Sequence, residues 1–243
     1  MRKVLCLAVG MFVLIFLLGS ANGCSIRSVR KISGSFDLPT FLQALPDSMR
    51  QNPFGDRHGL DLSAKEIDAL IAAGNVETQS GLIWRHEFID SAHTHLRVTR
   101  EGSVESLKYE LVSFAAPRSA QWVLVLQTLD DHCCSFGRWA LYLHQKGAWK
   151  DETGVRMPQP SWENFFSTEA LGEPKPAALA GNRYPFLMQV ATNPLRIELS
   201  IVADYVELSF PEAQASKMLA DLPKQPISYV WWKGHFVEQN LQN

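Results

Sequence analysis

From Gly81 onward, the chain consists largely of short segments in which apolar and polar residues alternate with a period of two. The segments are rich in Trp, Val, Ile, Leu, Tyr and Phe, and turn residues such as Glu101-Gly102 and Lys146-Gly147 separate them. A period of two places successive side chains on opposite faces of a β-strand, and aromatic and β-branched residues favour strands. The pattern predicts strands over 82–89, 96–99, 106–114, 122–128, 139–144, 186–191, 195–202 and 205–210, and a final hairpin over 227–237.

Helical patterns flank these strands. Ser63 and Glu66 have the spacing of a capping box, and Gly74 stands where a helix end needs a left-handed residue. We also expect helices over 38–49 and 211–222, because their apolar residues recur at helical spacing. The fold class is therefore predicted to be α+β, a predominantly antiparallel β-sheet with a few short helices.

Two segments of the chain resemble each other. Residues 142–151 (YLHQKGAWKD) and 229–238 (YVWWKGHFVE) share the tyrosine, the Lys-Gly pair, a following aromatic residue and a final acid. Lys-Gly hairpins with aromatic flanks are common turn chemistry, which explains the likeness without common ancestry. The alternative is an internal duplication, in which 81–151 and 185–239 are two similar β-meander halves.

The first 23 residues predict an export signal. Two basic residues precede an uncharged run of fifteen residues, Val4 to Leu18, and the small or polar stretch Gly-Ser-Ala-Asn-Gly follows it. This is the order of regions in a secretory signal, and the run is shorter than the ~20 apolar residues of a membrane span. We expect residues 1–23 to be removed, 24–36 to form a tether and 37–243 to form one globular domain.

Cys24 would then be the first residue of the mature chain. Ala21 and Gly23 supply the small side chains that an ordinary signal peptidase requires. The segment LLGSANGC also resembles, in part, the lipobox of bacterial lipoproteins, in which the cysteine sulfur carries a diacylglycerol. Gly23 and Cys24 fit that motif, whereas Ala21 stands where Leu is usual. Three basic residues within 27–31 oppose translocation and favour a retained anchor, which is the alternative.

Composition excludes some classes of function. Without the signal the formal net charge is −4, so the chain lacks the basic excess expected of a nucleic-acid-binding protein. No phosphate-binding loop, dinucleotide fingerprint, zinc-protease motif or nucleophile elbow is present, and we expect no cofactor. These observations favour a non-enzymatic binding or structural role in the bacterial cell envelope, either lipid-anchored in the membrane or periplasmic.

The reactive side chains cluster in Asp131-His132-Cys133-Cys134. Imidazole and thiolate groups bind soft metals, and an activated thiol would serve redox chemistry, so the alternative function is an exported enzyme or a redox or metal protein. Adjacent Cα atoms lie about 3.8 Å apart, which is shorter than ordinary disulfides prefer. We therefore favour a plain loop between two strands.

Consecutive aromatic residues mark a candidate binding surface. Trp231 and Trp232 lie in one expected strand and must face opposite sides, so one of them lies outside the core unless something covers it. An exposed tryptophan would suit a protein or glycan partner, or a membrane surface. His93 and His95 alternate in the same way before Arg97, and we interpret their face as the solvent-exposed one.

Overall fold

The structure is a computed structural model that describes residues 38–43, 60, 62–101, 105–118, 120–131, 134–146, 148–173, 185–223 and 226–239. The chain divides after Arg30 into two units, and every described residue belongs to the second. Cys24 and the predicted export signal therefore lie outside the described residues, and their processing stays a prediction.

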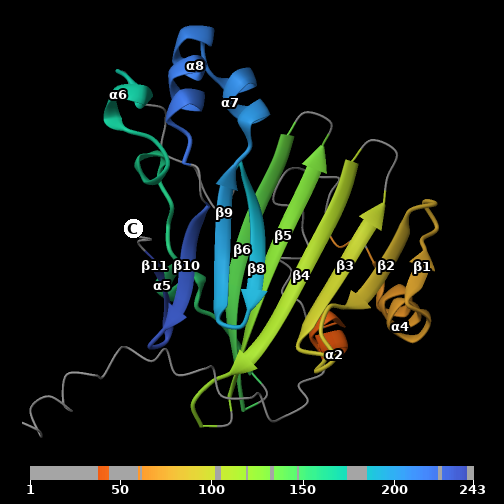
Figure 1. Cartoon of the computed structure of the whole chain (residues 1–243). Coiled ribbons are helices and arrows are strands. Elements are labelled where there is room, and N and C mark those ends of the chain that lie inside the picture. Colours follow the sequence, from red (N-terminus) through yellow and green to blue (C-terminus); the bar gives the residue numbers. More distant parts are fainter. Residues whose placement is uncertain are drawn as a thin grey trace, which may run out of the picture. The chain divides into compact units, whose positions relative to one another are not determined.

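Two antiparallel sheets form the fold (Figure 1). The seven-stranded sheet follows the order of the sequence: β1 (Asn75–Glu77), β2 (Ile83–Phe88), β3 (His95–Glu101), β4 (Glu105–Ala115), β5 (Gln121–Asp131), β6 (Cys134–Gln145) and β7 (Ala148–Asp151). The four-stranded sheet has the order β11-β10-β9-β8: β8 (Phe186–Thr192), β9 (Leu195–Ile201), β10 (Ile227–Trp232) and β11 (His235–Gln239). With the short helices, this confirms the predicted α+β class.

The helices are short and lie before, between and after these strands. They are α2 (Leu38–Gln43), α4 (Ala64–Ala73), α5 (Thr153–Arg156), the 3-10 turn η1 (Trp162–Asn164), α6 (Thr168–Leu171), α7 (Ala203–Ser209) and α8 (Glu212–Asp221). Within the part of the chain that the structure describes, none of them is long and apolar enough to cross a membrane.

Helix α4 begins and ends as its sequence predicts. The Ser63 hydroxyl accepts a hydrogen bond from the Glu66 backbone N–H at 3.3 Å, and the Glu66 carboxylate accepts one from the Ser63 N–H at 2.8 Å. Gly74 closes the helix with a φ of 78°, and its N–H donates to the Leu70 carbonyl. The capping box and the left-handed C-cap are therefore confirmed.

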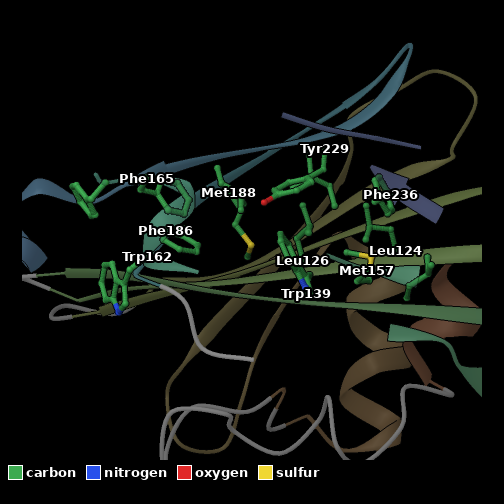
Figure 2. Packing of buried hydrophobic residues seen from close by; sticks show 14 of the residues in the cluster. Leu124, Leu126, Trp139, Met157, Trp162, Phe165, Phe186, Met188, Tyr229 and Phe236 are labelled. Carbon is green, nitrogen blue, oxygen red and sulfur yellow. The ribbon is translucent and has the colours of Figure 1, made fainter. Parts of the chain in front are cut away.

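The central strands of the larger sheet are buried on both faces. In β5, Leu124 and Leu126 point into the core between the two sheets (the inter-sheet core), whereas Val123 and Val125 point into a second core beneath α2 and α4 (the helix-side core). Figure 2 shows Met188 and Tyr229 of the smaller sheet on the opposite side of the inter-sheet core from Leu126. Burial on both faces explains why β5 is almost continuously apolar.

Gly137 of β6 lies close against β8 of the smaller sheet. A Cβ atom at this position would lie 2.9 Å from the Phe186 carbonyl oxygen and 2.5 Å from the Met188 methyl carbon. Real Cβ atoms do not tolerate such distances, so only glycine lets β8 cross β6 here. The absence of a side chain at Gly137 therefore allows this close packing of β8 on β6.

The strand predicted over 205–210 is wrong, because these residues lie in α7 and at its C-cap. Val206 is fully buried, Tyr205 stacks on Trp162 with 6.3 Å between ring centroids, and Phe210 meets the same indole edge-on at 5.6 Å. A run of six residues is too short for its apolar period to distinguish a helix from a strand.

The two similar segments form equivalent hairpins, β6–β7 and β10–β11. His144 pairs with Trp149 in the first hairpin, and Trp231 pairs with Phe236 at the same position of the second. Between the preceding Leu-Arg strand and this hairpin, however, the larger sheet has the strands β4 and β5, whereas the smaller has α7 and α8. The two segments therefore differ between the Leu-Arg strand and the hairpin, and the internal duplication stays a prediction.

Candidate functional site

The pleat of β10 separates the two consecutive tryptophans. Trp231 points into the inter-sheet core, where its ring meets Phe114 at 5.0 Å, Trp122 at 5.5 Å and Phe236 at 5.1 Å. Trp232 lies on the opposite, outer face of the four-stranded sheet and is 38% exposed. The side chains thus face in opposite directions, and it is Trp232 that faces solvent.

The outer face of the four-stranded sheet combines polar side chains with a few apolar ones. Its members alternate along each strand and are Leu187, Gln189, Ala191, Arg196, Glu198, Ser200, Ser228, Val230, Trp232, His235, Val237 and Gln239. Arg196 forms an ion pair with Glu198 at 2.7 Å, next to the half-buried Val230. Trp232 and His235 form the cross-strand pair that ends this face at the turn.

The turn of this hairpin has an unusual backbone. Lys233 has a φ of 47° and Gly234 a φ of 93°, so both residues are left-handed, as in the tight turns that suit the twist of a hairpin. Lys233 places its ammonium group 5.6 Å from the centroid of the Trp232 ring. We call the four residues Trp232, Lys233, Gly234 and His235 the hairpin tip.

Helix α5 fixes the hairpin tip from the side. The Arg156 guanidinium donates to the Gly234 carbonyl at 2.6 Å, stands 5.0 Å from the Trp122 ring centroid and is held by Glu152 at 2.9 Å. Hydrogen bonds from Lys150 and then from Arg156 hold the pKa of the buried Glu152 carboxyl below its usual value. The tip is therefore braced by a charged network and not by its own strands alone.

A pocket of about 340 Å³ lies beside α5. Its lining residues are Trp139, Asp151, Thr153, Gly154, Val155, Met157, Pro158 and Gln159. Asp151 is the ionisable member of this lining, and its carboxylate accepts a hydrogen bond from the Thr153 N–H at 2.9 Å, at the start of α5. The Asp151 carboxylate in the pocket thus caps the first turn of α5.

The reactive cluster lies at the end of the β5–β6 hairpin. Asp131 and Cys134 are paired across the two strands. His132 and Cys133 fall outside the described residues, and so does the Cys134 side chain. Among the residues that the structure covers, no three His, Cys, Asp or Glu side chains are grouped to hold a metal ion. The metal or redox role of this cluster stays a prediction.

A buried charged group was missed by reasoning from the sequence. Glu110 accepts hydrogen bonds from the Arg97 guanidinium, which also bonds Glu87 at 2.9 Å. His95 is 5% exposed, and its Nε2 lies 3.9 Å from Glu110, too far for a hydrogen bond. Within the described chain this Nε2 has no hydrogen-bond partner. Burial lowers the pKa of His95, although the nearby Glu110 opposes that shift.

The expectation that His93 and His95 share a solvent-exposed strand face is therefore wrong. His93 lies in the turn before β3, has a φ of 55° and stacks on Phe88 at 4.2 Å. His95 begins the strand and is buried. A period of two cannot distinguish a turn residue from a strand residue at the end of an element, which is where this prediction failed.

No protein-family model matches the sequence, and no curated protein is significantly similar to it. Among solved structures, a domain of an uncharacterised protein from Porphyromonas gingivalis W83 has a similar fold, with a TM-score of 0.53 and 18% sequence identity. The similarity covers 84% of this chain and 98% of that domain. At this level of identity the chain shares a fold with that domain, and the comparison says nothing further about its activity.

Proposed function

We propose that the protein is exported to the bacterial cell envelope, where it serves as a lipid-anchored or periplasmic binding protein without enzymatic activity. The basic, apolar and small-residue regions of 1–23, followed directly by Cys24, support export and anchoring. The observation that carries the binding role is the exposure of Trp232 on the outer face of the four-stranded sheet.

Trp232 is exceptional among the seven tryptophans of the chain, all of which the structure describes. The other six are buried or half-buried, and all six pack against other aromatic rings. A large aromatic side chain left on a polar sheet face retains much apolar area that a partner can bury. Tryptophan is also enriched among the residues that dominate binding energy at interfaces.

Intact-mass analysis of the protein from the membrane fraction tests export and anchoring. The expected species begins at Cys24 and carries the mass of its acyl groups. Cys24→Ser should lose that mass and leave the membrane fraction. A full-length species that retains Met1 would contradict both cleaved forms and restore the retained anchor.

Thiol chemistry separates this proposal from the alternative enzyme or redox protein. Slow alkylation of Cys133 and Cys134 with an ordinary thiol pKa is expected of a binding protein. Fast alkylation with a low thiol pKa at either cysteine would favour the exported enzyme, with Asp131 and His132 as neighbouring groups.

A further inference from the structure

The hairpin tip combines an exposed aromatic ring with an exposed positive charge. Trp232 and Lys233 are both exposed, and Lys233 takes part in no ion pair with another described residue. Among the ion pairs of the described residues, Arg196 pairs with Glu198, and Glu152 pairs with both Lys150 and Arg156. Lys233 therefore places a positive charge beside the indole.

This pairing of groups matches the surface of a bilayer. Tryptophan prefers the interface between headgroups and hydrocarbon, because its ring is apolar and its N–H is polar. A lysine beside it is attracted by anionic headgroups and keeps its ammonium in water while its methylene chain follows the apolar surface. Neither group needs a cavity for this kind of contact.

The position of the tip also favours a bilayer over a small ligand. The tip is the turn at one end of the four-stranded sheet, whereas small-ligand sites are concave (Figure 1). A second exposed apolar side chain, Val155 (78% exposed), precedes Arg156, the residue that binds the turn. The bracing of the turn by α5 means that little backbone entropy is lost when the tip meets a surface.

From the exposed Trp232, the positive charge of Lys233 beside it and the braced turn, we infer that the hairpin tip contacts the surface of an anionic lipid bilayer. This inference rests on the proposed anchoring at Cys24, which brings the bilayer within reach. The fourteen residues 24–37 span at most about 50 Å when fully extended, at about 3.3–3.6 Å each. A tethered domain meets the bilayer at high effective concentration, so a weak second contact suffices to orient it.

The test uses the full chain purified from the membrane fraction and reconstituted in phosphatidylglycerol vesicles with brominated acyl chains. Bromine quenches tryptophans that reach the hydrocarbon boundary, and Trp232 is the exposed one of the seven. We expect a loss of fluorescence that Trp232→Phe abolishes. Lys233→Glu should weaken the quenching about fivefold or more, because each basic residue near an anionic surface adds to binding.

Two matched controls are available in the other Lys-Gly hairpin. Lys146→Glu changes the same charge in a left-handed turn residue, and Trp149→Phe removes the half-buried indole that pairs across that hairpin. Both should leave the quenching unchanged. Thermal unfolding of each variant shows whether it is folded, and the wild-type measurement decides the question without any variant.

Equal fluorescence in brominated and unbrominated vesicles would overturn the inference, and so would quenching that Trp232→Phe retains. A blue shift of Trp232 with a soluble glycan or an envelope protein, without lipid quenching, would assign the tip to that partner and also overturn it. The intact mass of the same sample reports acylation at Cys24 separately. An acylated chain without quenching therefore refutes the bilayer contact and leaves the proposed function standing.

Discussion

At the scale of single residues, His95 and Glu110 mark where one face of the larger sheet changes from apolar to charged. His95 lies opposite Val112, which belongs to the inter-sheet core, and Glu110 lies opposite Arg97. Both ionisable side chains are only 6% exposed. A buried imidazole whose Nε2 lacks a hydrogen bond resists protonation, because the charged form would lose its hydration.

Stability should therefore depend on pH through His95. Its pKa is lowered in the folded protein, so the unfolded chain takes up the proton first as the pH falls. The free energy of unfolding should decrease from about pH 6.5, the ordinary histidine value, down to the folded value. Denaturant titrations of wild type and His95→Gln between pH 7 and pH 5 measure this, and His95→Gln should flatten the dependence.

His93→Gln is the control for that experiment, because His93 is exposed in the neighbouring turn. It should retain the wild-type pH dependence. Identical slopes for wild type and His95→Gln would show that the buried imidazole contributes nothing to it.

Gly234 provides a second prediction at this scale. With a φ of 93°, Gly234→Ala should lower the free energy of unfolding by about 1–2 kcal/mol, because a Cβ disfavours the left-handed region. The new methyl group would lie 3.4 Å from the Arg156 guanidinium, so backbone strain and not a severe clash is the cause. Gly154→Ala in α5, with open space around its Cβ, should be neutral or slightly stabilising. Equal effects of the two substitutions in chemical denaturation would refute the assigned strain.

At the scale of elements, the structural features that depend only on neighbouring residues can be predicted from the sequence. The capping box of α4 and the Lys-Gly turn at Gly234 depend on backbone rules that apply within a few residues. The long strands β4, β5 and β6 can be predicted because they are rich in β-branched and aromatic residues. The three-residue β1 and the four-residue helices α5 and α6 are too short to show a period.

In the candidate site, too, the sequence predicts local features but not contacts between distant residues. The sequence predicts that Trp231 and Trp232 face opposite sides of their strand. Which of them is exposed depends on which face of the four-stranded sheet packs against the seven-stranded sheet. The brace from Arg156 to Gly234 joins residues 78 positions apart, and no local pattern predicts it. The burial of His95 likewise depends on tertiary packing around β3.

Ser63 gives a prediction for an element. Ser63→Ala should cost about 0.5–2 kcal/mol, because the Glu66 N–H loses its acceptor at the start of α4. Glu66→Ala should cost less, and the double variant should cost less than the sum, since both residues form one box. Denaturation midpoints of the four proteins measure these differences. Strict additivity would mean that the two hydrogen bonds act independently.

At the scale of the whole molecule, the two cores are joined through shared strands. Strands β4, β5 and β6 each send alternate side chains into the inter-sheet core and into the helix-side core. Neither core can lose its packing without exposing strands that the other core requires. We therefore expect the described domain to unfold as one cooperative unit, although each sheet is built from a different part of the sequence.

Matched leucines in the two cores test this cooperativity. Leu126 is 2% exposed in the inter-sheet core, and Leu111 is fully buried in the helix-side core. Each Leu→Ala substitution should cost about 2–5 kcal/mol through lost burial and the cavity left behind. Because the cores share strands, both variants should keep a single unfolding transition that shifts to lower temperature, and far-UV circular dichroism and tryptophan fluorescence should report the same midpoint. If Leu111→Ala moved only one of two resolved transitions while Leu126→Ala moved the other, the cores would unfold separately and the shared strands would not couple them.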